Sequence, residues 1–448
     1  VLPSPRPAIE QALIEWDWRM QDGIGTEREP ATYAEATRKT LDRGDALVRD
    51  LGTGLPGALA TAWNELRPRF DALVASRTIE GPAGVRLWRD VHGLRRRIAL
   101  SNRLAHPGPL VFVKHVPSLF SHQLTQYTGN CARPGGGLFV LEEPGRSMRC
   151  RPLASGLPVG SYQFAEVAPD GARVLFAFCA VDRVAPNREA HLDHHFHLYE
   201  AAADGSAVRR LTDGDADDFA PRYLPSGKIV FISTRRGGFH RCGAGPCPVH
   251  TLATCDADGS DPHPISFHEP HEWDRPVLAD GRVIYTRWDY VDRNAVHYQQ
   301  LWSVRPDGSD VRIVYGNNTF NPVGVWEARP VPGSNRIMAT AAAHHAMTAG
   351  SVILLDLAKG VDGPAPITRL TPDALFPESE APVTRLGPGA WHAPVGVTAP
   401  PPISPESRRW PGHCYKAPQP LSETYFLASY SFDRLIGVRT RYPNPVRY

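Results

Sequence analysis

The segment 191–197 holds several potential metal ligands. It reads His-Leu-Asp-His-His-Phe-His, so that His191, His194 and His195 stand beside an aspartate. Imidazole and carboxylate groups together suit a transition metal such as zinc, copper or iron. A polar loop that leads into a β-strand would show the same residues, so both interpretations stay open.

A second set of ligand types lies in the segment 240–250. His240, Cys242, Cys247 and His250 offer the nitrogen and sulfur atoms that tetrahedral zinc takes, although their spacing is not that of a standard finger. Cys242 and Cys247 are also near enough in sequence to form a disulfide in an oxidising compartment, or they remain free thiols.

Two further segments carry the same ambiguity. His344 and His345 follow a strand-like run and serve equally well as metal ligands or as hydrogen-bonded parts of the framework. The acidic run from Asp213 to Asp218 is interpreted as a solvated loop, with calcium as the alternative, because calcium prefers carboxylate oxygens.

Charged and amide side chains in such loops are candidates for binding and catalysis. Arg235 and Arg236 could clamp an anion, because guanidinium groups match carboxylate or phosphate in geometry, or they could pair with nearby aspartates. The remaining candidates are His122 and Asn317 for ligand binding, and Asp289, Asp292, Arg293 and Glu378 for catalysis. Metal-assisted redox or hydrolytic chemistry is the reaction class expected of such a set.

Several kinds of chemistry have no motif in this sequence. There is no Cys-x-x-Cys-His, so the chain cannot attach a c-type haem covalently. There is also no Gly-x-Ser-x-Gly elbow and no Walker loop. The glycines at 135–137 open a strand-like run and not a helix, which argues against a phosphate-binding loop.

Composition limits the class of protein. A chain of 448 residues is long enough for two or more domains, and a net charge of +2 argues against a nucleic-acid partner. No run of 18 apolar residues is present, so no transmembrane segment is expected. Seven cysteines are too few for a disulfide scaffold, and Cys179 and Cys255, in apolar runs, are predicted to be buried thiols. The chain begins at Val1 and not at Met, which favours a processed protein or a fragment.

These candidate residues are spread over a repeating sequence. Asp-Gly or a similar turn followed by a β-rich run recurs about every 54 residues, at 169–176, 225–231, 279–285 and 332–338. A second motif, Asp-Gly-Ser, alternates with this turn-and-strand repeat along the chain. Repeats of about 40 to 55 residues that each hold four short strands are typical of a β-propeller.

The repeat gives the expected architecture: a mainly β chain with a helical region at 1–105 and a six-bladed propeller at 106–448. Helix-like segments lie at 7–20, 31–51 and 57–76. A further helix carries one apolar stripe: Leu87, Val91, Leu94 and Ile98. The six units are expected at 107–153, 160–212, 219–266, 273–316, 323–371 and from about 418, where the last unit is short, with a Pro/Gly-rich insertion at 381–413.

The four strands of a blade are labelled A to D in chain order. The connections from strand B to strand C, and from strand D to strand A of the next blade, lie on one face of the propeller. Loops on a rigid scaffold concentrate binding and chemistry. Twelve of the 18 histidines fall in these connections: His115, His122, His191, His194, His195, His240, His250, His268, His271, His297, His344 and His345. A histidine-rich channel mouth is therefore expected.

Combinations of short motifs resemble the hydrazine synthase alpha subunit-related family. They include Ser-Thr-Arg-Arg-Gly at 233–237 and Tyr-Thr-Arg-Trp-Asp-Tyr-Val-Asp-Arg at 285–293. Further matching segments are 110–114, 120–122, 133–137, 217–219, 222–225, 343–345, 369–372 and 376–378. The single repeats also resemble those of TolB-type propellers.

The resemblance implies a six-bladed propeller in an exported, periplasmic bacterial protein. Hydrazine synthase itself uses c-type haems on its alpha subunit within a multi-subunit complex. This chain lacks the attachment motif, so no haem ligand is carried over. The first interpretation is a propeller that binds a metal or a small polar or anionic ligand at its mouth. A scaffold that holds a protein partner is the alternative, and a haem-dependent synthase subunit is a third.

Overall fold

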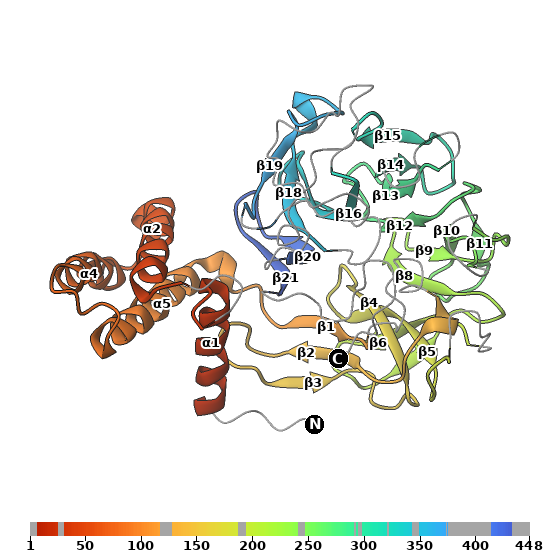
Figure 1. Ribbon diagram of the computed structural model, residues 1–448. Coiled ribbons are helices and arrows are strands. Elements are labelled where there is room, and N and C mark those ends of the chain that lie inside the picture. Colours follow the sequence, from red (N-terminus) through yellow and green to blue (C-terminus); the bar gives the residue numbers. More distant parts are fainter. Residues whose placement is uncertain are drawn as a thin grey trace. The chain divides into compact units, whose positions relative to one another are not determined.

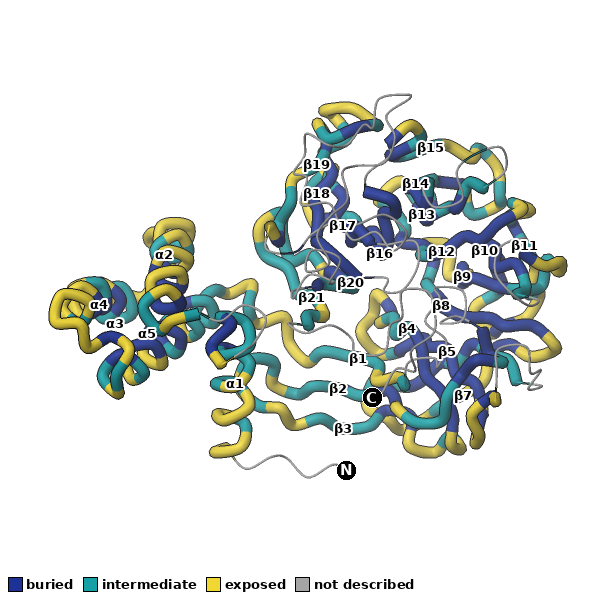
Figure 2. The backbone as a smooth tube through the Cα atoms, in the orientation of Figure 1, coloured by how far each residue is buried: buried dark blue, intermediate teal, exposed yellow. Residues whose placement is uncertain are grey.

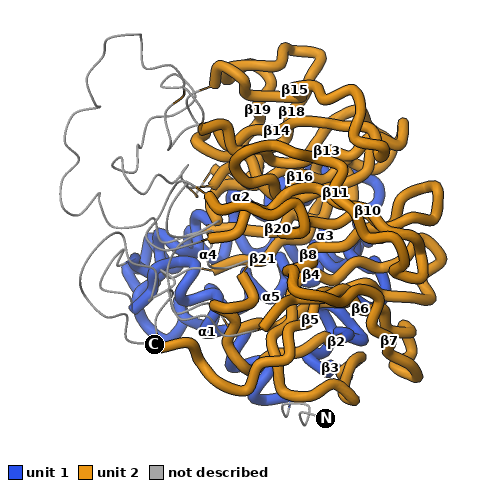
Figure 3. The backbone as a smooth tube through the Cα atoms, turned by 90° about the vertical axis from the view of Figure 1, so that its right-hand side faces the viewer, with its two compact units in different colours: residues 1–110, 140–151 blue, residues 111–139, 152–448 orange. Residues whose placement is uncertain are grey.

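The computed structural model describes residues 7–25, 31–116, 128–186, 194–240, 247–290, 293, 298–319, 322–342, 349–372, 374 and 414–431 (Figure 1). The chain divides into two compact units (Figure 3). The first comprises Val1–Leu110 and Val140–Arg151, and the second comprises Val111–Phe139 and Pro152–Tyr448.

The first unit is built mainly from five α-helices. They are α1 (Pro7–Asp22), α2 (Tyr33–Leu51), α3 (Gly57–Asn64), α4 (Leu66–Ala75) and α5 (Pro82–Ser101), with short 3₁₀ turns at Gly52–Gly54 and Arg103–Ala105. The predicted helical segments are confirmed. The predicted stripe on α5 is also confirmed, because its four residues are at most 6% exposed and form the core of this unit with Trp63 and Phe70.

Local chemistry explains where these helices begin. The Thr32 side chain accepts a hydrogen bond from the Glu35 N–H (3.1 Å) and so caps α2. The Glu80 carboxylate accepts the N–H groups of Tyr33 and Ala34 (2.9 Å each), which places a negative charge at the positive end of the same helix. Pro82 occupies the first turn of α5, where its missing N–H costs nothing.

The second unit is mainly β-sheet. Two four-stranded antiparallel sheets follow one another along the chain. The first holds β4 (Gly160–Val167), β5 (Arg173–Ala180), β6 (His197–Ala202) and β7 (Val208–Arg210). The second holds β8 (Asp218–Tyr223), β9 (Ile229–Ser233), β10 (Thr251–Cys255) and β11 (His263–Pro264).

Two more successions of four strands are joined into one sheet. They are β12 (Glu272–Trp273), β13 (Val283–Trp288), β14 (Gln299–Val304) and β15 (Arg312–Tyr315), then β16 (Gly324–Pro330), β17 (Ile337–Ala342), β18 (Ser351–Leu355) and β19 (Ile367–Arg369). A short parallel pairing of Gln299 with Gly324 connects β14 to β16. Each succession otherwise pairs antiparallel, as the sequence repeat predicts.

The remaining strands form smaller sheets. β20 (Cys414–Pro420) pairs with β21 (Phe426–Ser431), and β1 (Leu110–Lys114), β2 (Gly137–Leu141) and β3 (Cys150–Pro152) form a three-stranded sheet. The segment 381–413 lies outside the described residues. The structure is therefore mainly β, with several sheets and an N-terminal helical segment.

The predicted Asp-Gly turns are confirmed. Gly171, Gly227 and Gly281 adopt positive φ angles of 69°, 86° and 83°, which glycine accepts without steric cost. Where an aspartate precedes the glycine, its side chain accepts a hydrogen bond from the N–H of the residue after the glycine. In the first turn the Ala172 N–H donates to Asp170 Oδ1 (2.9 Å). These turns leave the middle strands of each sheet buried, and Figure 2 shows this core as dark blue segments.

The first strand of each succession contains the same irregularity, which the sequence analysis did not predict. A non-glycine residue there has a positive φ angle: Phe164 (49°), Ala220 (56°), Asp274 (53°), Glu327 (56°) and Ala417 (52°). Across these residues the pairing of β4, β8, β16 and β20 with the next strand shifts, which is a β-bulge. For β12, Trp273 pairs with Thr286 but the Pro276 carbonyl accepts the Ile284 N–H (2.8 Å).

We call these five residues the inner bulges, because four of the strands concerned, β4, β8, β12 and β16, lie nearest the middle of the second unit (Figure 1). The first four recur at the sequence period of about 54 residues. A left-handed φ costs a residue with a Cβ about 1–2 kcal/mol. The repeated backbone irregularity thus marks the same point on successive inner strands.

Candidate functional site

The structure describes nine of the residues predicted to form a site: His194, His195, Arg235, Arg236, His240, Cys247, Asp289, Arg293 and Asn317. The other seven lie outside the described residues: His122, His191, Cys242, Asp292, His344, His345 and Glu378. The gathering of the loop histidines around one opening therefore stays a prediction.

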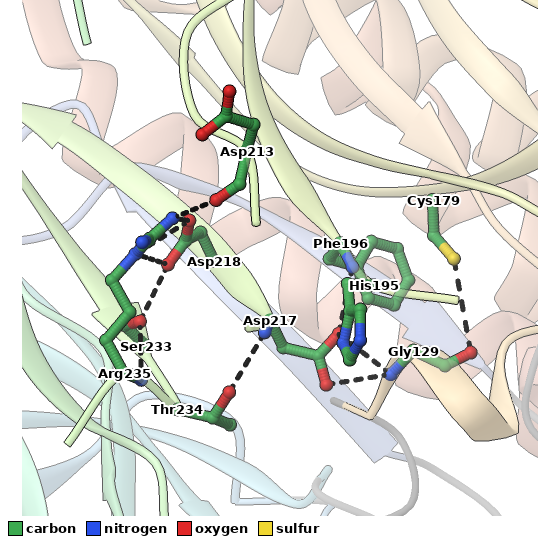
Figure 4. A network of polar contacts seen from close by, with 10 residues as sticks. All are labelled: Gly129, Cys179, His195, Phe196, Asp213, Asp217, Asp218, Ser233, Thr234 and Arg235. Atoms are coloured by element: carbon green, nitrogen blue, oxygen red, sulfur yellow. Dashed lines mark hydrogen bonds and ion pairs between the residues drawn. The ribbon is translucent and has the colours of Figure 1, made fainter. Parts of the chain in front are cut away.

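Arg235 pairs with Asp218, which is the second alternative given for it by the sequence (Figure 4). Its Nη2 and Nε donate to the two Asp218 carboxylate oxygens at 2.6 and 3.0 Å, and Ser233 Oγ donates to Oδ1 at 2.6 Å. Asp218 is fully buried, and burial raises its pKa while the hydrogen bonds from Arg235 oppose that shift. Arg236 donates to the neighbouring Gly237 carbonyl (3.1 Å).

Asp217 is also buried and surrounded by donors (Figure 4). Its Oδ1 accepts the N–H groups of Phe196 (2.8 Å) and Gly129 (3.1 Å), and His195 Nδ1 lies 3.9 Å away. Burial raises the pKa of Asp217 to about 6, against the lowering effect of these N–H groups. This carboxyl therefore holds together three separate segments of the chain.

The interpretation of the acidic run as a solvated loop is wrong for two of its members. Asp213 and Asp215 are exposed, but Asp217 and Asp218 are 4% and 0% exposed. Their hydrogen-bond donors lie far away in sequence, so the run of aspartates gave no sign of burial. Cys179 and Cys255 are confirmed as buried thiols, and burial raises the pKa of Cys255 to about 12.

His240 belongs to a stack of aromatic rings. Its ring centroid lies 4.3 Å from that of His271 and 4.6 Å from that of Trp288, with planes within 25° of parallel. Trp288 in turn stacks on Tyr290 at 5.6 Å. The lone pairs of imidazole nitrogens lie in the ring plane, so nearly parallel rings do not aim them at a common ion.

His250 packs at the edge of this stack. Its ring centroid lies 4.8 Å from that of His271 and 5.1 Å from that of Phe219, and both of its ring nitrogens are buried with no hydrogen-bond partner among the described residues. Burial lowers the pKa of His250 to about 3, so the ring is neutral at physiological pH. No group of three or more His, Cys, Asp or Glu side chains that could hold a metal occurs among the described residues.

Three predicted residues do come together. Arg293 Nη1 lies 3.6 Å from Asp289 Oδ2 and donates to Asn317 Oδ1 at 3.2 Å, while its Nη2 donates to the Asn317 carbonyl at 2.6 Å. The guanidinium also stacks on Tyr298, 4.0 Å from the ring centroid. Arg287 Nε donates to Asp289 Oδ1 at 2.8 Å. We call Arg287, Asp289, Arg293, Asn317 and the nearby His268 the Asp289 cluster.

His268 is a neutral member of this cluster. Its Nε2 lies 2.9 Å from the Trp288 carbonyl and 3.7 Å from Asp289 Oδ1. A carbonyl only accepts, so Nε2 carries the hydrogen and Nδ1 keeps a lone pair. Burial and the Arg287 charge lower the pKa of His268 to about 4, whereas the Trp288 carbonyl and Asp289 raise it. The cluster is therefore suited to hydrogen bonding with a polar ligand.

Sequence reasoning missed the charged residues beside the inner bulges. Arg222, Arg275 and Arg329 follow the bulge residues of three consecutive inner strands by one or two positions. The available signal was an arginine in or just after a strand-like run, recurring at the period of the repeat.

Comparisons with known proteins give structural neighbours only. No protein-family model and no curated sequence matches the chain. Hydrazine synthase of Kuenenia stuttgartiensis is 12% identical, with a TM-score of 0.48 over 72% of this chain and 42% of that protein. TolB of Acinetobacter baumannii is 12% identical, with a TM-score of 0.38 over 64% of this chain and 59% of TolB.

A third neighbour is an oligogalacturonate lyase solved with manganese, 10% identical, with a TM-score of 0.35 over 52% of this chain and 59% of the lyase. The chain spans less than two thirds of the length of each of these three proteins. At these scores the likenesses carry no argument about activity, substrate or partner.

Proposed function

We propose that this chain is the six-bladed propeller portion of an exported bacterial protein related to the hydrazine synthase alpha subunit, and that its Asp289 cluster binds a small polar ligand. The succession of four-stranded antiparallel sheets supports the blades, with β1–β3 and β20–β21 as the two incomplete ones. No helix among the described residues is long and apolar enough to span a membrane.

The observation that carries the ligand proposal is the convergence of Asp289, Arg293 and Asn317, residues that come from two separate loops. Two guanidinium groups face one carboxylate in this cluster, and His268 is neutral, so the cluster has an excess positive charge. Such a site favours a ligand with oxygen acceptors. Because an arginine lies near each Asp289 oxygen, this carboxylate is better placed to orient a ligand than to remove a proton from it.

Arg293→Gln tests this proposal. The substitution keeps one amide donor and removes the charge, and losing a charge-assisted hydrogen bond weakens binding about tenfold or more. Mass spectrometry of small molecules that co-purify with the native protein should find a species retained by wild type and depleted from R293Q. Arg312→Gln is the matched control, because Arg312 is 67% exposed and pairs with Asp310 on an outer strand. Equal contents in wild type and R293Q would contradict the proposal.

A scaffold that holds a protein partner is the second candidate. Phe239 and Phe267 are 67% and 73% exposed, and each precedes a histidine of the loops described above, His240 or His268. Large exposed aromatic side chains are typical of protein interfaces. Co-purification of one partner in a fixed ratio, lost in Phe239→Ser and retained in R293Q, would favour the scaffold.

Zinc, copper or iron remains a proposal for the loops that contain His191, His194 and His195, and His344 and His345. Calcium remains a proposal for the acidic run from Asp213 to Asp218. Elemental analysis of the purified protein tests them. A near-stoichiometric metal would support metal-assisted redox or hydrolytic chemistry with Asp289, Asp292, Arg293 and Glu378 as its polar groups. A Soret band after expression with haem maturation would instead support a haem-dependent synthase subunit.

A further inference from the structure

Three arginines are placed beside the inner bulges of neighbouring strands. Arg222 lies two residues after Ala220 in β8, Arg275 directly follows Asp274 after β12, and Arg329 lies two residues after Glu327 in β16. Figure 1 shows β8, β12 and β16 as innermost strands of the second unit. A bulge redirects the side chains that follow it, so the same backbone device sets the direction of all three arginines.

The middle arginine is buried without a counter-charge in contact. Arg275 is 6% exposed, and within the described part of the chain its guanidinium makes no hydrogen bond or ion pair. Its nearest recorded contact is the Phe164 ring, with 5.9 Å from Cζ to the centroid. Nε of Arg275 is buried and unpartnered, and buried charges in proteins are normally paired.

The flanking arginines satisfy part of their own charge. Arg222 Nη1 lies 2.8 Å from Glu166 Oε1 in β4. In the part of the chain that the structure describes, Arg329 Nη1 donates only to the Ala328 carbonyl (3.4 Å), and its buried Nε has no hydrogen-bond partner. Asp274, which precedes Arg275, already accepts the Glu327 N–H (2.6 Å).

Arg222 and Arg275 remain charged although Arg275 is buried and Arg222 is mostly buried. Burial and mutual repulsion lower the pKa of Arg222 to about 10 and that of Arg275 to about 9, while Glu166 and Asp274 act in the opposite direction. Both values leave the guanidinium protonated at neutral pH. Three positive charges therefore face the two negative charges of Glu166 and Asp274, since Glu327 is matched by Lys416 at 3.5 Å.

We propose that Arg222, Arg275 and Arg329 together bind one small oxyanion, a carboxylate or a phosphate. Guanidinium forks from three strands present N–H groups that match oxyanion geometry, and one anion supplies the missing negative charge. The side chains of Arg222 and Glu166 are 17% and 23% exposed, so solutes reach the edge of the group. The strained φ angles at five equivalent positions are of the kind that persists at binding sites.

Isothermal titration calorimetry on the full chain in a low-salt buffer at neutral pH tests this proposal, with inorganic phosphate and malonate as the two probes. Wild type should bind at least one probe with one site per chain. R275Q and R329Q should each raise the dissociation constant about tenfold or more, because each removes a charged donor. R312Q should bind as wild type does. Preference for phosphate or for malonate identifies the group that the natural ligand carries.

Failure of wild type to bind either probe would overturn the proposal, as would equal affinity in wild type, R275Q and R329Q. If the glutamine variants do not fold, R275K and R329K keep the charge and lose the fork. An unchanged dissociation constant in both lysine variants would then also overturn it. The variants distinguish this site from the Asp289 cluster: a probe bound at the Asp289 cluster would lose affinity in R293Q and keep it in R275Q and R329Q, whereas the proposed site predicts the reverse.

Discussion

Asp218 and Glu272 occupy the same position in consecutive sheets, two residues before the inner bulges Ala220 and Asp274, and both are fully buried. Asp218 is neutralised by the Arg235 guanidinium. Among the described residues, Glu272 accepts only the Ser266 hydroxyl and the Leu252 N–H, and burial raises its pKa to about 7. The repeat therefore fixes where a buried acid lies, while its surroundings decide whether a partner or a proton neutralises it.

The largest expected effect comes from removing the partner. Arg235→Met leaves the Asp218 carboxylate buried and unpaired, which should lower the free energy of unfolding by about 3–5 kcal/mol. Urea denaturation at neutral pH measures this loss. The double variant with Asp218→Asn should recover most of it, and a loss below about 1 kcal/mol in the single variant would place the pair among ordinary surface ion pairs.

A smaller, pH-dependent effect is expected at Glu272. Its pKa is about 7 in the folded chain and 4.5 when unfolded, so folding retains a proton that the unfolded chain releases. The stabilising contribution is complete below pH 4.5 and is lost as pH rises through 7, by about 3 kcal/mol at most.

Glu272→Gln should remove this pH dependence. Unfolding measured across that window should therefore show a shallower fall in stability for the variant than for wild type. The histidines of lowered pKa, His250 and His268, give the opposite slope in both proteins and cancel in the difference. Parallel curves for the two proteins would show that Glu272 is already ionised when folded.

The smallest expected effect concerns the bulges themselves. Ala417 has a φ of 52°, so Ala417→Gly should relieve a steric cost and stabilise the chain by about 1 kcal/mol. Ala428→Gly in the neighbouring strand β21 is the matched control, and there glycine should destabilise by about 0.5–1 kcal/mol. Thermal unfolding of both variants distinguishes these signs, and destabilisation by both would argue against strain at the bulge.

Local patterns predicted much of the framework. The α5 stripe and the Asp-Gly turns follow from neighbouring residues, and the structure confirms them. The inner bulges do not follow from local residue types, since Phe164 and Ala220 are not residues that favour positive φ. Pairing with the next strand imposes that conformation.

The candidate sites show the same division. Proximity of Asp289 to Arg293 follows from their spacing along one loop, and Asn317 joins them through the repeat. Burial of Asp217 depends on Gly129, 88 residues earlier in the chain, so no local pattern could reveal it. Arg275 could not be recognised from the sequence, because what distinguishes it is burial without a counter-charge in contact, and only the folded chain shows which groups surround a residue.

The pairing of Gln299 with Gly324 gives two four-stranded successions a common edge. Edge strands of separate sheets open independently, whereas strands in one hydrogen-bonded sheet protect each other's amides. The part of the second unit that runs from β12 to β19 should consequently exchange its deepest amide hydrogens as one cooperative block. A ligand held between these successions would slow exchange throughout that block.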